Sequence, residues 1–143
     1  MNTADRIIQQ LRLLPHPEGG HYRQTWIADS ANGARPDGTC IYFLLKAGEV
    51  SRWHRVDATE IWHYYDGAPL ILSMAETKAG PARDFRLGPN VLADEAPQLI
   101  VPNHHWQAAR SMGDYTLVGC TVSPAFHFDG FEMMDAGGEI PYD

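Results

Sequence analysis

The feature that most constrains this chain is a series of short β-type runs, separated by turn residues, that fills almost all of its length. The runs are rich in β-branched and aromatic side chains, and turn pairs such as Asn32-Gly33 and Asp66-Gly67 lie between them. Eight or nine strands without a second long helix predict an all-β fold, with a jelly roll and an immunoglobulin-like sandwich as the leading options. The predicted strands are His21–Ile27, Thr39–Lys46, Glu49–Val56, Ile61–Tyr65, Pro69–Ala75, Ala82–Leu87, Gln98–Val101, Trp106–Arg110 and Tyr115–Val122.

A single helical pattern precedes these strands. Apolar side chains at positions 7, 8, 11 and 14 recur at helical spacing, so a helix is expected over residues 4–14. Thr3 is the expected N-cap, and Pro15 is expected to end the helix. We expect the apolar face of this helix to pack on the domain or on a second subunit.

The charge balance restricts the partners that this chain can bind. Eleven basic against eighteen acidic side chains give a net charge of −7 with histidine neutral. Such a charge repels phosphate backbones and anionic lipids, so neither nucleic acid nor a membrane surface is an expected partner. The longest apolar run, Cys40–Leu45, is too short for a membrane span, and no signal peptide is visible. The two cysteines, Cys40 and Cys120, indicate buried thiols and a cytoplasmic protein.

One segment in the middle of the chain resembles the first conserved motif of the cupins. That motif consists of a glycine, five residues, HxH, three or four residues, a glutamate, six residues and a second glycine. In Gly48–Gly67 both glycines, the first histidine (His54) and the glutamate (Glu60) are in register. Val56 stands where the motif has its second histidine.

Further landmarks make the resemblance more specific. Pro102–Gln107 occupies the place of the second cupin motif, and Pro15–Arg23 and Gly119–Val122 match a family of small single-domain cupins long catalogued as a domain of unknown function. The similarity spans Leu13 to Glu132. It implies a cupin jelly-roll β-barrel, or double-stranded β-helix, with one N-terminal α-helix, usually paired into a homodimer, with the ligand site in the barrel mouth.

The resemblance implies one cupin domain over residues 1–143, with the helix at 4–14, the barrel at about 21–132 and a C-terminal tail at 133–143. Strand alternation directs Ile61, His63 and Tyr65 out of the barrel. Together with the helix, these three side chains are the expected dimer interface.

A metal-binding cupin takes two histidines and a glutamate from its first motif and one histidine from its second. Here His54 and Glu60 occupy two of these places, whereas Val56 and Gln107 replace the other two ligands. Valine offers no lone pair, and a glutamine carbonyl is a poor substitute for imidazole. No cofactor is therefore expected, and a divalent metal bound weakly by His54, Glu60 and Gln107 is the remaining metal hypothesis.

The same cavity retains residues for acid–base chemistry. A carboxylate beside an imidazole fixes its tautomer and raises its pKa, so His54 and Glu60 are expected to form such a pair. By alternation Trp62 and Tyr64 share the face of Glu60. We therefore predict His54, Glu60 and Tyr64 as catalytic residues. Arg23, Trp62 and Gln107 are the predicted substrate-binding residues.

Three functional classes stay open at this point. The first is an epimerase or isomerase that acts without metal on a small polar molecule, sugar-like or carboxylated, by analogy with the sugar-nucleotide epimerases of the cupin fold. The second is a cupin that binds a small molecule without turnover. The third is a metal-dependent cupin enzyme with a degenerate His/Glu/Gln site.

Overall fold

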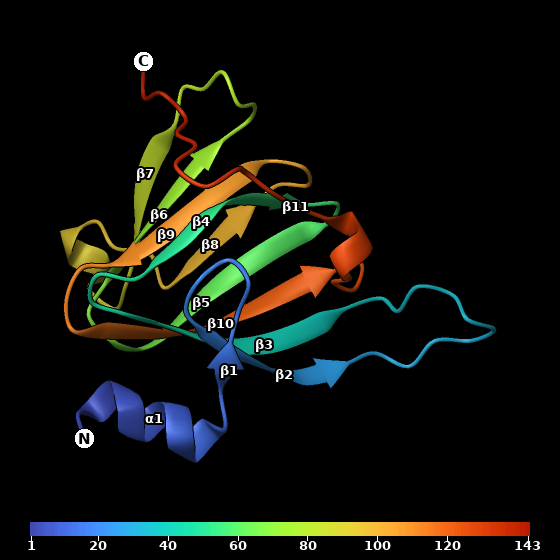
Figure 1. Cartoon of the computed structure of the whole chain (residues 1–143), viewed down its shortest axis with the longest axis horizontal. Coiled ribbons are helices and arrows are strands. Elements are labelled where there is room, and N and C mark those ends of the chain that lie inside the picture. The colour runs from blue at the N-terminus through green and yellow to red at the C-terminus, as the bar shows by residue number, and fades with distance from the viewer.

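The computed structural model describes all 143 residues and consists of two antiparallel β-sheets with one α-helix outside them (Figure 1). The elements are α1 (Thr3–Leu11), β1 (Leu14–Pro15), β2 (His21–Ile27), β3 (Thr39–Lys46), β4 (Val50–Val56), β5 (Thr59–Gly67), β6 (Leu70–Ala75), β7 (Arg83–Leu87), β8 (Gln98–Val101), β9 (Trp106–Ser111), β10 (Tyr115–Ser123) and β11 (Phe131–Met133), with short 3-10 turns at Val91–Ala93 and Phe128–Gly130.

The sheet topology is that of a jelly roll. One sheet has six strands in the order β1-β2-β3-β10-β5-β8, and the other has five in the order β11-β4-β9-β6-β7. Strands distant in sequence thus pair, as where β10 lies between β3 and β5. This arrangement confirms the predicted all-β jelly roll with an N-terminal helix.

The helix α1 differs from the prediction at both ends. Asn2, not Thr3, is the N-cap, and its Oδ1 accepts a hydrogen bond from the backbone N–H of Asp5 at 2.8 Å. The helix ends at Leu11 because Arg12 takes a left-handed conformation with φ 58°, and Leu14 already pairs with β2. The apolar face of α1 packs on its own barrel, against buried Leu44. No helix of the structure has the length and apolarity needed to cross a membrane.

A β-bulge in β4 decides which side chains of this strand face inward. Ser51 pairs with Ala109 and His54 with Gln107, so β4 uses one residue more than β9 between these two positions. Strict alternation would place Ser51 and His54 on opposite faces, whereas the extra residue turns both into the barrel, where both are buried.

The loop between β1 and β2 carries a second group of inward side chains. Its turn is closed by the backbone hydrogen bond from His16 N to Gly20 O, 2.9 Å, and the loop is attached to β4 by Arg52 N donating to Glu18 O, 2.8 Å. Gly19, with φ +112°, lies so close to the Val50 carbonyl that any Cβ would collide with it. The close approach presses the loop onto the sheet and directs Glu18 into the barrel.

Candidate functional site

The space between the sheets is divided along each strand. On β3, Phe43 and Leu45 belong to the main aliphatic and aromatic core, whereas Thr39 and Ile41 line a cavity of about 190 Å³. On β5, Trp62 belongs to the core and Glu60 to the cavity. The cavity therefore occupies the other end of the same barrel. Its lining residues are His16, Glu18, Tyr22, Gln24, Thr39, Ile41, His54, Val56, Glu60, Val122, Phe126 and Phe128.

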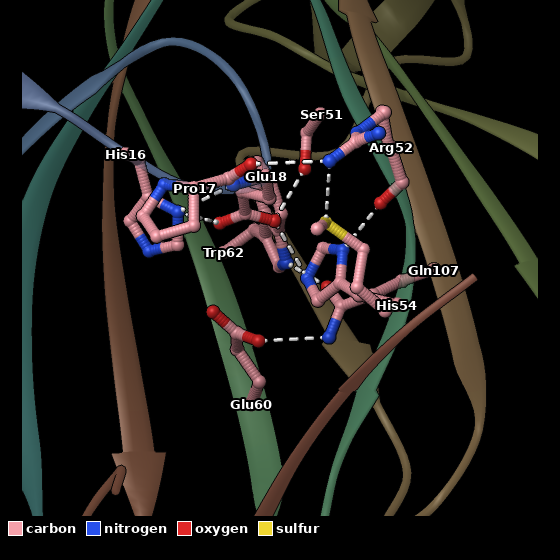
Figure 2. Close-up of polar contacts among 10 residues, drawn as sticks. His16, Pro17, Glu18, Ser51, Arg52, His54, Glu60, Trp62 and Gln107 are labelled. Atoms are coloured by element: carbon pink, nitrogen blue, oxygen red, sulfur yellow. Dashed lines mark hydrogen bonds and ion pairs between the residues drawn. The ribbon is translucent and has the colours of Figure 1, made fainter. Parts of the chain in front are cut away.

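His54 is held as a buried imidazolium (Figure 2). Its Nδ1 lies 2.6 Å from the carbonyl oxygen of Arg52, and its Nε2 lies 2.8 Å from Oε2 of Glu18. Both neighbours only accept hydrogen bonds, so both ring nitrogens carry protons. Burial alone would lower the pKa of His54, but the Glu18 carboxylate outweighs it and raises that pKa to about 9.

Glu18 is the anionic partner in this pair. Its Oε2 also accepts a hydrogen bond from Ser51 Oγ at 2.5 Å, and the residue is 6% exposed. Burial acts to raise the pKa of Glu18, but the charge and hydrogen bond of His54 outweigh it, so that the pKa lies below its ordinary value. Glu18 and His54 thus form a buried charge pair that persists at neutral pH.

His16 has the opposite character, because it is a neutral imidazole. Its Nδ1 accepts the backbone N–H of Glu18 at 3.1 Å, so the ring proton resides on Nε2. The 3.4 Å approach of Nδ1 to Oε1 of Glu18 consequently involves no hydrogen bond. Burial is the main cause of a lowered pKa for His16, and the His54 cation adds to it, although Glu18 acts in the other direction.

Glu60 is held at the cavity by a chain of two hydrogen bonds. The indole N–H of Trp62 donates to Oε1 of Gln107, and Nε2 of Gln107 donates to Oε1 of Glu60, both at 2.8 Å. Because indole is only a donor, the orientation of the Gln107 amide is fixed. Burial raises the pKa of Glu60 to about 7, against the opposing influence of His54.

Aromatic side chains that follow β10 cover the mouth of the cavity. Phe126 and Phe128 line it, and Phe131 stacks on the His54 ring with centroids 5.4 Å apart at 29°. Asp57 and Arg35 attach this covering segment. Arg35 binds the Asp57 carboxylate through both terminal nitrogens and donates from Nε to the Ala125 carbonyl. The cavity is thus polar inside and aromatic at its entrance.

The donor set does not fit a metal ion. Both nitrogens of His54 are used by Arg52 and Glu18, and both ends of the Gln107 amide are used by Trp62 and Glu60. Val56 lines the cavity at the place of the missing histidine. No group of three or more His, Cys, Asp or Glu side chains is arranged to hold a metal. The three weak metal candidates of the sequence therefore have other uses here.

The structure brings three of the predicted site residues together and changes the partner of one. His54 and Gln107 are cross-strand neighbours and Gln107 donates to Glu60, but the carboxylate bonded to His54 is Glu18. Glu60 acts on His54 only as a nearby charge. Trp62 lies beneath the cavity in the core and orients Gln107.

Two predicted site residues lie elsewhere. Tyr64 shares the face of Glu60, but four residues of strand separate them by about 13 Å, with Trp62 in between. Its hydroxyl donates to the carbonyl of Gly67. Arg23 is exposed on the outside of β2, because its neighbours Tyr22 and Gln24 face the cavity, and its guanidinium lies over the Tyr42 ring. The structure therefore places neither side chain at the cavity.

Sequence reasoning missed His16, Glu18 and Ser51. The first two lie in the segment Pro15–Arg23, which carried part of the family resemblance, so a signal was present in the sequence. From that segment, only Arg23 is among the predicted site residues. Ser51 could not be found by strict alternation, because the bulge in β4 turns it to the same side as His54.

The family model of the cupin superfamily (DUF985) matches residues 5–134. The chain belongs to the cupin superfamily. Among solved structures, this cupin is similar to a protein from Shewanella oneidensis, with 39% identity, a TM-score of 0.86 and coverage of 94% of this chain and 85% of the other. A hypothetical protein from Leishmania major is 31% identical, with a TM-score of 0.82 and coverage of 93% and 88%.

More distant likenesses concern the fold alone. Oxalate decarboxylase from Bacillus subtilis is 11% identical to this cupin, with a TM-score of 0.64, over 84% of this chain and 29% of that one. Comparison with curated proteins gives no match.

Proposed function

We propose that this cupin binds a small, neutral, polar molecule in its barrel cavity and that Glu60 exchanges a proton with it, as in an isomerase or epimerase that uses no metal. The observation that carries the proposal is the state of Glu60. Its carboxyl lines the cavity, is held through one oxygen by Gln107, and has a pKa of about 7. A general acid–base group is most effective when its pKa lies near the working pH.

The charges around the cavity support a neutral ligand. His54 is the only cationic side chain that lines it, and Glu18 already neutralises that charge at 2.8 Å. No arginine or lysine lines the cavity, so a carboxylated ligand would find no free partner there. Of the two ligand classes expected from the sequence, the sugar-like one therefore fits better than the carboxylated one.

The size of the cavity limits the ligand further. About 190 Å³ is smaller than the roughly 300 to 1,000 Å³ typical of pockets for drug-sized molecules. The aromatic entrance formed by Phe126 and Phe128 favours a molecule with one apolar face. A compact polyhydroxylated or carbonyl-bearing molecule meets both conditions.

The test is hydrogen exchange in a panel of small neutral compounds incubated with the protein in D₂O at pH 7 and followed by NMR. We expect protein-dependent deuterium incorporation into at least one compound and a loss of about 100-fold or more in Glu60→Gln. This variant keeps an oxygen acceptor for Gln107. Glu76→Gln, at an exposed glutamate, is the matched control and should behave as wild type.

The alternatives give other outcomes of the same experiment. Binding without exchange in any compound would indicate a cupin that binds without turnover, in contradiction to the proposed proton transfer. Exchange that is lost on dialysis against a chelator and restored by a divalent metal would indicate the metal-dependent class, which the occupied donors of His54 and Gln107 disfavour.

We also propose that the protein is a homodimer. The outer face of the six-stranded sheet carries Ile61 paired with Ile100, which is 57% exposed, and Tyr65 is 48% exposed nearby on β5. Such a face and the unpaired edge of β8 favour association with a second copy. Light scattering should give twice the 16.0 kDa mass of one chain. Ile100→Lys should shift the measured mass toward that of a single chain. A wild-type monomer at micromolar concentration would contradict the proposal.

A further inference from the structure

His16 is a polar group of the cavity whose role the proton transfer by Glu60 leaves unexplained. Its ring is fixed by edge contacts with Tyr22, centroids 4.4 Å apart at 71°, and Phe43, 5.9 Å apart at 79°. Its Nδ1 is engaged by a backbone N–H, which leaves the proton on Nε2. No atom of the protein accepts a hydrogen bond from this Nε2, and the residue lines the cavity.

This N–H is reachable from open space, because the only fully buried side-chain nitrogen or oxygen without a partner is Nδ1 of His21. An acceptor held in the cavity that His16 lines can therefore reach it. The backbone fixes the tautomer, so His16 offers the cavity a donor and no acceptor. The ring also retains this form at neutral pH, because burial lowers its pKa. A neutral imidazole N–H can bind an oxygen in which negative charge develops without handing over its proton.

We propose that Nε2–H of His16 binds the carbonyl oxygen of the ligand, and that the ligand is a small neutral aldehyde or ketone with a hydrogen on the adjacent carbon. This inference rests on the proposed function and names its substrate class. His16 and Glu60 line the same cavity of about 190 Å³, so one small molecule can contact both. Figure 2 shows the two side chains on the same side of the Glu18–His54 pair.

The reaction that this geometry supports balances without any further reagent. The Glu60 carboxylate takes the proton from the carbon next to the carbonyl, which breaks the C–H bond and forms an O–H bond on Glu60. The electron pair of that bond forms a carbon–carbon double bond, and the carbonyl π electrons move onto the oxygen, where His16 Nε2–H stabilises the enolate. Return of the proton from Glu60 to the same carbon regenerates the carbonyl, and when Glu60 has first exchanged its proton with water the net result is hydrogen exchange. Epimerisation follows when the enolate turns over in the cavity before the proton returns to its other face.

The Glu18–His54 pair has a defined part in this scheme. The His54 cation lies near Glu60 and lowers its pKa, against the effect of burial. Without the cation, Glu60 would be protonated over more of the neutral range and unable to act as the base. His54 is therefore a positioning and charge-setting residue, and its two engaged nitrogens keep it from transferring protons itself.

The experiment compares His16→Phe and His16→Gln in the D₂O exchange assay, with glyceraldehyde and hydroxyacetone as carbonyl probes and a panel of lactones, amides and polyols as compounds without an aldehyde or ketone. Phenylalanine removes the donor, whereas glutamine keeps an N–H. We expect a fall of about 100-fold in exchange for His16→Phe and a smaller one for His16→Gln. His105→Gln, in the loop before β9, is the matched control and should leave the rate unchanged.

A second measurement needs no turnover. Long-range nitrogen–proton NMR spectra should identify the Nε2–H tautomer of His16 at pH 7, and hydroxyacetone should shift its Nε2 resonance while glycerol does not. A purely structural His16 would show no such difference between the probes.

The outcomes separate this inference from the proposed function. Exchange that depends on Glu60 but is unchanged in His16→Phe, or that occurs only in compounds without an aldehyde or ketone, overturns the role of His16 and leaves the proton transfer standing. Absence of exchange in every compound overturns both.

Discussion

The two ends of the barrel are formed by the same strands but differ in what they bury: one is an apolar core, and the other is a cluster of charged side chains around a cavity. At one end, Leu45, Leu72 and Val118 fill the space between the sheets with a dry core. At the other end, Glu18, His54 and Glu60 are buried to a comparable degree, and a cavity remains between them. Apolar burial stabilises the first end without directional requirements. The second end is stable only because each charged group has a partner.

This difference indicates where stability and function reside. An apolar side chain in the core contributes through the surface that it removes from water, about 25 cal/mol per Å². A buried ion pair contributes little net stability, but removal of one partner is strongly destabilising because the other charge stays buried. The polar end therefore fixes the positions and protonation states of its groups at the expense of stability, as expected for a functional site.

The largest loss of stability is expected from removal of Glu18, the anionic partner of His54. Glu18→Ala leaves the His54 cation without a counter-charge and Ser51 without an acceptor, and it should lower the free energy of unfolding by about 3–5 kcal/mol at pH 7. Leu72→Ala at the apolar end should lower it by about 2–5 kcal/mol through a cavity. Denaturant titration measures both.

The two losses of stability, in Glu18→Ala and in Leu72→Ala, should depend differently on pH. Above pH 9 the wild-type His54 gives up its proton, so the penalty of Glu18→Ala should shrink there, whereas that of Leu72→Ala should not. Glu18→Gln, which keeps the volume, should lower the pKa of His54. A penalty for Glu18→Ala that is the same at pH 7 and pH 10 would contradict the assigned ion pair.

The free energy of unfolding of the wild-type protein should also depend on pH through these groups. The folded pKa of His54, about 9, is raised above its ordinary 6.5, so its contribution is complete below pH 6.5 and is lost as the pH rises through 9. The raised pKa of Glu60 acts in the same direction between pH 4.5 and about 7. The His54 part amounts to about 3 kcal/mol. His54→Gln should lose the part of the fall that His54 contributes up to pH 9 and keep only the part due to Glu60. A flat wild-type curve from pH 6.5 to 9 would refute the imidazolium.

Most of the fold could be predicted from the sequence because it depends on local signals. The predicted strands His21–Ile27, Thr39–Lys46 and Gln98–Val101 agree with the structure residue for residue. The strands β1 and β11, with two and three residues, are too short to produce an alternation pattern. They exist because longer neighbours offer backbone partners to them.

The site could be predicted only in part, because its decisive features are not local. The alternation pattern of this strand does not predict the bulge that turns Ser51 and His54 to the same face. The partner of His54, Glu18, comes from a loop far earlier in the chain, and the close approach of Gly19 to β4 positions that loop. Alternation places Tyr64 on the correct face of β5, but being on one face does not bring two side chains together: four residues of strand put Tyr64 against the core, away from the cavity at Glu60.

A smaller effect is expected at the boundary between the two ends, where Gln107 connects Trp62 to Glu60. Gln107→Leu keeps the volume but leaves the indole N–H and the carboxyl without this partner, which should lower the free energy of unfolding by about 1–3 kcal/mol. The hydrogen bond from Gln107 lowers the pKa of Glu60, so its loss should move that pKa above 7. Carboxyl NMR titration measures the shift, and an unchanged midpoint would show that the amide does not act on Glu60.

The smallest loss of stability is expected from breaking a charge pair outside the barrel. It provides a direct comparison with the buried Glu18–His54 pair. Asp57 accepts two hydrogen bonds from Arg35, yet both side chains are about one-third exposed. Since water screens an exposed pair, Asp57→Asn should lower the free energy of unfolding by at most about 1 kcal/mol. The hydrogen bonds from Arg35 hold the pKa of Asp57 below 3.8, so even this small contribution is present at neutral pH and is lost as the pH falls below that value. Denaturant titrations at low and high salt should show the penalty shrinking with salt, unlike that of Glu18→Ala. A loss of 3 kcal/mol or more for Asp57→Asn, as large as that for the buried pair, would mean that burial is not what distinguishes the polar end of this barrel.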